Sequence, residues 1–274
     1  MADPRPTTIV AAAAAADDAA WEGLRRLTAA RIGLTRSGAS IATGAMLELR
    51  LAHARARDAV HAPLDEEQLR ANLAASGWPL LAVSSAVQDR TQYLMRPDLG
   101  RQLAPAATAV LAGHEAGGHD VALVITEGLS ARAVERHGPP LLAALLRQLR
   151  TEDWRIAPLT LVRQGRVAIG DAVAQILRAR LVVVLIGERP GLSAPHSMGA
   201  YLTWQPGPQT TDANRNCISN IRPEGIDPAD AARKIMQLMR AMRARELSGV
   251  ALKDETERLL IDAGAQSLTG RRPG

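Results

Sequence analysis

The 274-residue sequence predicts an α/β protein in which a Rossmann-like, doubly wound parallel sheet follows a helical N-terminal region. Three short apolar runs carry this prediction, and they lie at 121–125, 159–162 and 181–186. Each run is continuous rather than alternating, as is typical of strands covered on both faces. Helical segments are expected between them, at 130–150 and 170–179. This strand–helix order favours parallel pairing with right-handed crossovers.

Three segments of different character are expected along the chain. Residues 1–20 are Ala-rich and of low complexity, and they predict a flexible tail. Residues 21–112 predict a mainly helical N-terminal domain that includes a helix capped by Asp65 and a short strand at 80–84. The polar, Gly-rich segment at 113–119 is placed at the boundary, so that residues 113–274 form the Rossmann-like domain, whose last helix is expected at 228–245.

Composition excludes several classes of protein. The net charge is +5, but the basic residues are spread along the chain and only six side chains are Trp or Tyr, with no Phe. Nucleic-acid binding is therefore not expected, because it draws on basic patches and exposed rings. One cysteine, Cys217, excludes an intrachain disulfide and a zinc site of several thiolates. The sequence lacks a membrane-spanning stretch and a secretory leader, so a cytoplasmic protein is expected.

Ligands of open parallel sheets bind at the carboxyl ends of the strands, which here lead into Gly-containing loops at 126–131, 163–167 and 187–194. The first and third loops share an acid after the strand and the tetrapeptide Gly-Leu-Ser-Ala. Two interpretations stay open, namely two equivalent loops facing one ligand or two helix entries built alike. Gly-x-Gly-x-x-Gly, Walker-type and Gly-x-Ser-x-Gly motifs are absent, and the spacing of the histidines does not indicate a metal site.

Glu188 is the first candidate binding residue. It comes directly after Gly187, which follows the apolar run at 181–186. It precedes Arg-Pro-Gly, which stiffens the loop. A carboxylate at a strand end can accept hydrogen bonds from the hydroxyl or amide groups of a ligand. The alternative is an ion pair with Arg189 or Arg163.

The second candidate is the segment at 214–225, which is dense in Asn, Ser and Arg around Cys217. This composition is unlike that of a core strand, and it predicts a binding loop. The alternative is a polar turn with one buried cysteine. Since no histidine base lies nearby in sequence, a catalytic thiolate has no support.

Three blocks of sequence resemble the small (light) subunit of ethanolamine ammonia-lyase. They are Leu-Ile-Gly-Glu-Arg-Pro-Gly-Leu at 185–192, Gly-Ala-Tyr-Leu-Thr at 199–203 and Asn-Cys-Ile-Ser-Asn-Ile-Arg-Pro-Glu-Gly at 216–225. Upstream segments at 30–34, 53–61 and 96–101 are similar to the same family, so the resemblance covers about residues 27–253.

The resemblance implies a two-subunit lyase that converts ethanolamine to acetaldehyde and ammonia by adenosylcobalamin-dependent radical chemistry. In that family the large subunit holds the substrate, while the Rossmann-like domain of the small subunit covers the cobalamin. By motif position, the implied cobalamin contacts are Val167, Glu188 and Cys217. The family keeps the cofactor's own dimethylbenzimidazole on cobalt, so no histidine ligand and no catalytic residue are expected from this chain.

The resemblance also implies a hetero-oligomer of several large and small subunit pairs, and it leaves open whether the enzyme lies inside a bacterial microcompartment. The competing hypothesis is a non-catalytic regulatory module that senses a small ligand through the same loops.

Overall fold

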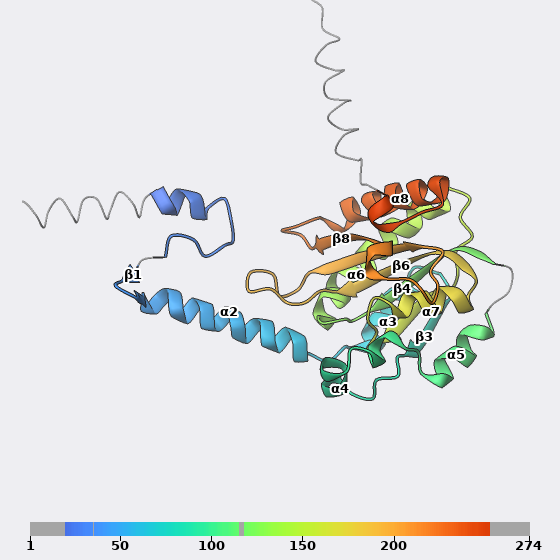
Figure 1. Ribbon diagram of the computed structural model, residues 1–274, viewed down its shortest axis with the longest axis horizontal. Coiled ribbons are helices and arrows are strands. Elements are labelled where there is room, and N and C mark those ends of the chain that lie inside the picture. The colour runs from blue at the N-terminus through green and yellow to red at the C-terminus, as the bar shows by residue number, and fades with distance from the viewer. Residues whose placement is uncertain (1–19, 35, 115–117, 253–274) are drawn as a thin grey trace, which may run out of the picture. The chain divides into compact units, whose positions relative to one another are not determined.

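A six-stranded mixed sheet carries most of the fold, in the strand order β3-β5-β4-β6-β7-β8 (Figure 1). The computed structural model describes residues 20–34, 36–114 and 118–252. The strands are β3 (Leu80–Ser84), β4 (His119–Thr126), β5 (Leu159–Arg163), β6 (Ala179–Gly187), β7 (Met198–Trp204) and β8 (Arg215–Ile221). The pairs from β3 to β6 are parallel, whereas β7 and β8 are added in antiparallel fashion.

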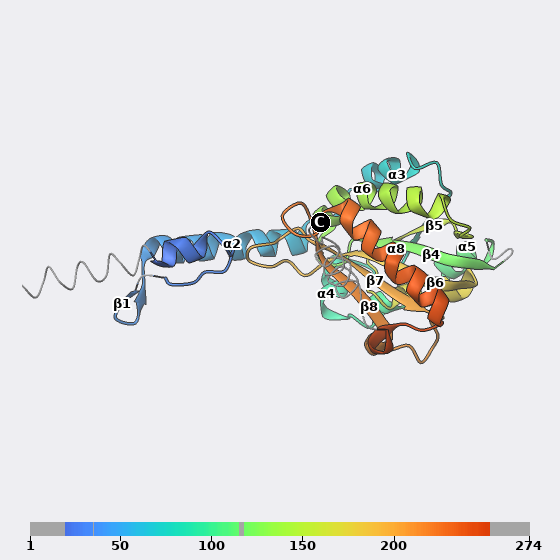
Figure 2. The same cartoon turned by 90° about the horizontal axis from the view of Figure 1, so that it is seen from above.

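Helices cover both faces of this sheet because its central strands are apolar on both sides. One core cluster joins the sheet to α3 (Glu66–Ala74), α6 (Ala131–Arg150) and α8 (Pro228–Arg245), which lie next to one another in Figure 2. The other cluster joins it to α5 (Pro105–Ala112) and α7 (Ile169–Ile176). Among the core side chains, Leu123, Val183 and Leu185 are fully buried.

The α/β class and the three predicted strands are confirmed, and so are the helices between them and the last helix at 228–245. The parallel pairing predicted for these three strands is confirmed, but the sheet as a whole is mixed, because β7 runs antiparallel to β6 and β8 runs antiparallel to β7. A Rossmann-like doubly wound arrangement is not confirmed. The strand predicted at 80–84 is found as β3, where it pairs with β5, so the sheet extends across the boundary predicted near residue 113.

The binding loop predicted at 214–225 is a strand over most of its length, and this prediction is corrected. In β8 the side chains of Arg215, Ile218 and Ile221 are buried, while Asn216, Ser219 and Asn220 are half-buried or exposed. An edge strand with one solvated face needs few apolar residues. Its polar composition therefore resembles that of a loop.

The chain divides into two compact units, one of residues up to Asp58 with Gly191–Pro195 and the other of Ala59–Pro190 with the residues from His196 onward. In the first unit residues 20–25 are helical, and the Gly-rich break at 37–40 forms a hairpin of β1 (Arg36–Ser37) and β2 (Ser40–Ile41). Gly38 adopts φ +61° in this turn, a conformation that glycine tolerates best. Helix α2 (Thr43–His61) follows.

The remaining elements of the second unit are short. As predicted, the Asp65 side chain accepts a hydrogen bond from the Gln68 amide and caps α3. Helix α4 (Arg90–Met95) and three 3-10 turns complete the described elements, the turns being Leu99–Arg101, Asp212–Asn214 and Gly249–Ala251. The predicted tail at 1–20 lies outside the described residues except for Ala20. Within the described residues, no helix combines the length and the apolar character needed to cross a membrane.

Candidate functional site

A pocket of about 470 Å³ lies at the carboxyl ends of β5 and β6. Val167 and Glu188, two of the three predicted contacts, line it. Cys217, the third, is paired across β7 and β8 with Tyr201, which also lines the pocket. The remaining lining residues are Tyr93, Leu129, Arg166, Ile186, Gly187, Arg189 and Ser219. The fold thus brings together three residues that are separated by 21 to 50 positions in the sequence.

Hydrogen bonds from β4 hold the loop that carries Val167. The Gln164 amide donates to Glu127 Oε1 over 2.8 Å, and the Gly165 amide donates to Thr126 Oγ1 over 3.0 Å. The Tyr93 hydroxyl donates to the Gly165 carbonyl at 3.1 Å. Since these partners come from neighbouring elements, the position of Val167 depends on the register of the sheet rather than on the loop sequence alone.

Two guanidinium groups lie over the ring of the fully buried Tyr93. The distances from the ring centroid to the Cζ atoms of Arg166 and Arg90 are 4.1 and 4.7 Å. Cation–π attraction stabilises such pairs more strongly when they are removed from water. Burial raises the pKa of Tyr93 to about 12, so its hydroxyl stays protonated and able to donate at neutral pH.

Glu127 is a buried acid that the sequence analysis did not single out. Its side chain is 4% exposed, and burial raises the pKa of its carboxyl group above the ordinary value. Hydrogen bonds from Gln164 and Thr126 and the charge of Arg90 oppose this shift. The sequence carried one signal for Glu127, since an acidic residue directly follows a predicted strand at this position, as it does at Glu188.

Glu188 ties the end of β8 to the segment that precedes β7. Its carboxylate accepts hydrogen bonds from Ser219 Oγ at 2.5 Å, from Ser197 Oγ at 2.7 Å and from the Asn220 amide at 3.2 Å. The alternative of an ion pair with Arg163 is wrong, because Arg163 pairs with Glu66 at 3.9 Å. Within the described residues, Glu188 forms no ion pair with Arg189 either.

Cys217 is exposed at the surface, so the alternative of a buried cysteine in a polar turn is wrong. The pKa of its thiol is raised, mainly by desolvation by the surrounding protein and to a smaller extent by the charge of Glu188. A hydrogen bond with the Tyr201 hydroxyl lowers this pKa and so opposes the shift. The thiol is thus protonated at neutral pH, which is unsuited to nucleophilic catalysis.

The loops after β4 and β6 are in direct contact. The Leu129 amide donates to the Gly187 carbonyl at 3.0 Å, and a Cβ atom on Gly187 would lie 2.2 Å from the Ser130 carbonyl oxygen. Ser130 stands at the start of α6, whereas residues 191–194 lead into β7 and no helix begins there. The interpretation of the two Gly-Leu-Ser-Ala segments as similar helix entries is therefore wrong.

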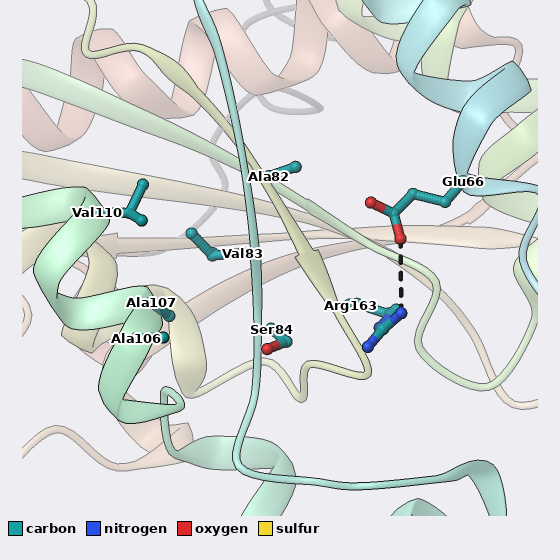
Figure 3. A pocket seen from close by; sticks show the side chains of 8 residues that line it. All are labelled: Glu66, Ala82, Val83, Ser84, Ala106, Ala107, Val110 and Arg163. Carbon is teal, nitrogen blue, oxygen red and sulfur yellow. Dashed lines mark ion pairs between the residues drawn. The ribbon is translucent and has the colours of Figure 1, made fainter.

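A separate pocket of about 280 Å³ runs along the outer edge of β3 (Figure 3). Figure 3 shows Val110 and Ala107 of α5 on one side and the Glu66–Arg163 ion pair on the other, with β3 passing between them. None of the predicted binding residues lines this pocket. Within the described residues, no cluster of three His, Cys, Asp or Glu side chains could hold a metal ion.

Comparison with known proteins identifies the family. The model of the ethanolamine ammonia-lyase light chain (EutC) family matches residues 18–253. The chain belongs to this family. It is 52% identical over 250 residues to the ethanolamine ammonia-lyase small subunit of Ralstonia nicotianae. This alignment covers 90% of this chain and 93% of the relative. It is also 52% identical over 253 residues to the small subunit from Azotobacter vinelandii. This alignment covers 91% of this chain and 93% of the relative.

The predicted resemblance to the small-subunit family is thus confirmed. The matched region begins at residue 18, nine residues before residue 27, where the resemblance was predicted to begin. A third relative, the small subunit from Pseudomonas fluorescens strain Pf-5, is 50% identical over 250 residues, covering 90% of this chain and 91% of the relative. The pocket at the carboxyl ends of β5 and β6 lies inside the matched region.

Proposed function

We propose that this chain is the small subunit of an ethanolamine ammonia-lyase and that its pocket at the carboxyl ends of β5 and β6 binds one side of adenosylcobalamin. In this proposal it assembles with a large subunit, as several pairs, and the complex converts ethanolamine to acetaldehyde and ammonia. One observation carries the cofactor assignment. Val167 and Glu188 line one pocket, and Cys217 pairs with a third lining residue, Tyr201.

The lining of the pocket suits the edge of a corrin ring, which is apolar on its faces and carries amide side chains around its rim. Leu129, Ile186 and Val167 supply apolar surface, while Arg166 and Ser219 supply hydrogen-bonding groups. Mixed linings of this kind combine apolar burial with a few oriented polar contacts. Since a cobalamin is far larger than about 470 Å³, this wall would cover only part of it. The large subunit would cover the rest.

When bound, the cofactor supplies the radical chemistry, and the residues of this chain bind, orient and exclude water. Glu188 would hold Ser219 and the end of β8 in place, because it accepts hydrogen bonds from both Ser219 and Asn220.

Co-expression with the large subunit tests the proposal. We expect a complex on size exclusion that takes up adenosylcobalamin and releases acetaldehyde from ethanolamine. Cofactor uptake should also slow the alkylation of Cys217, because the cofactor would cover this exposed thiol. A purified complex that neither binds cobalamin nor turns over ethanolamine contradicts the proposal. A chain that stays a stable monomer or homodimer when mixed with the large subunit favours the regulatory module instead.

A further inference from the structure

The lining of the proposed cofactor pocket carries two guanidinium groups and one carboxylate. The guanidinium groups belong to Arg166, in the loop after β5, and to Arg189, just after the end of β6, and the carboxylate is that of Glu188. The oxygens of Glu188 already accept hydrogen bonds from β8 and from the segment before β7. The lining therefore presents more positive than negative charge, and its carboxylate is occupied by other donors.

Arg166 is held in place by several contacts. Its Nη2 donates to the Tyr93 carbonyl at 2.9 Å, its guanidinium group lies over the Tyr93 ring, and its amide donates to the Gly100 carbonyl at 2.7 Å. A Cβ atom on Gly100 would lie 2.7 Å from Arg166 Cγ, so glycine at this position leaves room for the arginine stem. Fixing a long side chain costs conformational entropy. The fold thus presents a preorganised guanidinium group to the pocket.

A third guanidinium group, that of Arg90, adds to the positive charge beside the pocket. Arg90 and Arg166 both lie over the ring of Tyr93. Burial lowers the pKa of Arg90, and the charge of Arg166 lowers it further, against the opposing effects of Tyr93 and Glu127. Like charges that share a site disfavour one another. An anion bound in the pocket would reduce this repulsion.

Arg189 supplies a charge that no other described residue neutralises. Its side chain is exposed, and within the part of the chain that the structure describes it forms no ion pair and no hydrogen bond. Its backbone is nevertheless restrained on both sides. The Glu188 amide donates to the Ser197 carbonyl at 2.9 Å, and Pro190 restricts the residue before it to an extended conformation. The guanidinium group is therefore free to bind a ligand at the rim of the pocket.

We propose that Arg166 and Arg189 bind the phosphodiester group that joins the corrin ring of the cofactor to its dimethylbenzimidazole nucleotide. A guanidinium group forms paired, charge-assisted hydrogen bonds with phosphate oxygens. The other groups at the periphery of a cobalamin are amides and hydroxyls, which carry no charge. The phosphodiester is thus the peripheral group that matches an excess of positive charge.

This inference rests on the proposed function, and it gives Arg166 and Arg189 a role in recognising the cofactor beyond that of Val167, Glu188 and Cys217. It also orients the cofactor, because its nucleotide loop would face the loops after β5 and β6. The competing occupant of the same positive site is an acidic side chain of the large subunit.

An adenosylcobalamin analogue in which a methylphosphonate replaces the phosphodiester tests the inference, since it removes the charge with little change of shape. Spectroscopic titration of the complex of small and large subunits gives a dissociation constant for the analogue and for adenosylcobalamin. We expect adenosylcobalamin to bind more tightly by roughly tenfold or more at low salt, because charge-assisted hydrogen bonds are the stronger ones. This preference should decrease as the ionic strength rises, because salt screens exposed charges.

Arg189→Gln and Arg166→Gln should each narrow the preference for adenosylcobalamin. Arg147→Gln, on an exposed arginine of α6 that does not line the pocket, is the matched control and should keep the wild-type preference. Val167→Ala, which removes apolar contact only, should weaken both cofactors by one factor. A merely structural role of Arg166 in holding its loop would have the same effect as Val167→Ala. The ratio of the two dissociation constants therefore separates recognition of the phosphodiester from loss of structure.

The inference is overturned if the wild-type complex binds the two cofactors equally well, a result that needs no variant to fold. It is also overturned if the preference persists in the variant that carries both substitutions. Loss of assembly with the large subunit in Arg189→Gln, seen by size exclusion without cofactor, would assign this charge to the subunit interface instead. Failure of the proposed function gives a different result, because the wild-type complex would then bind neither cofactor.

Discussion

Arg215 of β8 and Asp171 of α7 form a bidentate ion pair, in which Nη1 lies 2.7 Å from Oδ1 and Nη2 lies 2.7 Å from Oδ2. The Arg215 side chain is 3% exposed, and its Nη1 also donates to Thr203 Oγ1 of β7. Asp171 follows Val167 by four residues, and Arg215 precedes Cys217 by two. The pair thus links the two segments that carry these predicted cofactor contacts.

Asp171→Asn should destabilise the chain, because it leaves the buried Arg215 charge with only the exposed carboxylate of Asp212, 3.5 Å from Nε, as a counterion. We expect a decrease of about 3–5 kcal/mol in the free energy of unfolding, measured by urea titration. Asp230→Asn is the control, since Asp230 pairs with Arg233 on the exposed face of α8. Its effect should stay below about 1 kcal/mol. Equal effects of the two substitutions would contradict the assignment of Asp171 as a structural ion-pair partner.

Glu188→Ala should lower the affinity of the complex for adenosylcobalamin by roughly 10-fold to 100-fold, because Ser219 and the end of β8 lose their shared acceptor. Spectroscopic titration measures this change. Glu224→Ala removes an exposed carboxylate just after β8 and should leave the affinity unchanged. If Glu188→Ala instead lowers the thermal midpoint and leaves affinity as it was, the residue has only a structural role.

Alkylation of Cys217 by iodoacetamide should have a pH midpoint above the ordinary thiol value, since its surroundings raise the pKa. The same cysteine in the unfolded chain is the internal control, as the sequence has no other. Tyr201→Phe should move the midpoint higher still, because it removes the hydrogen bond that lowers the pKa. A midpoint at or below that of the unfolded chain would show that the thiolate is stabilised instead.

Glu127→Gln should change how stability depends on pH. The folded pKa of Glu127 is raised, so its contribution is fully present below the unfolded pKa and is lost as pH rises through the folded value. The unfolding free energy of the variant relative to wild type should therefore increase between pH 4.5, near the ordinary glutamate pKa, and neutral pH. Chemical denaturation at several pH values measures it, with Glu224→Gln as the exposed control. A difference that stays constant with pH would contradict the burial of an ionisable acid.

The parts of the fold that the sequence predicted are those with local signals. Continuous apolar runs identified β4, β5 and β6, and the Asp65 cap with its flanking turn identified α3. The strands β7 and β8 were missed. β8 lies at the edge of the sheet with one solvated face, so its polar residues resemble those of a loop, whereas β7 lies between β6 and β8 and is mostly buried. The pairing of β3 with β5 joins residues about 80 positions apart, and no local pattern reports such a contact.

The sequence by itself determined the α/β class, the family and the positions of the central strands along the chain, since these depend on short-range periodicity and on motifs read in one dimension. The motifs also marked Val167, Glu188 and Cys217 as predicted cofactor contacts. Only the tertiary structure decided that these residues meet at one edge of a mixed sheet, and that Glu127 is buried and Arg90 half-buried beside them. Burial arises when distant segments exclude water from one another, so it becomes visible only once the chain is folded.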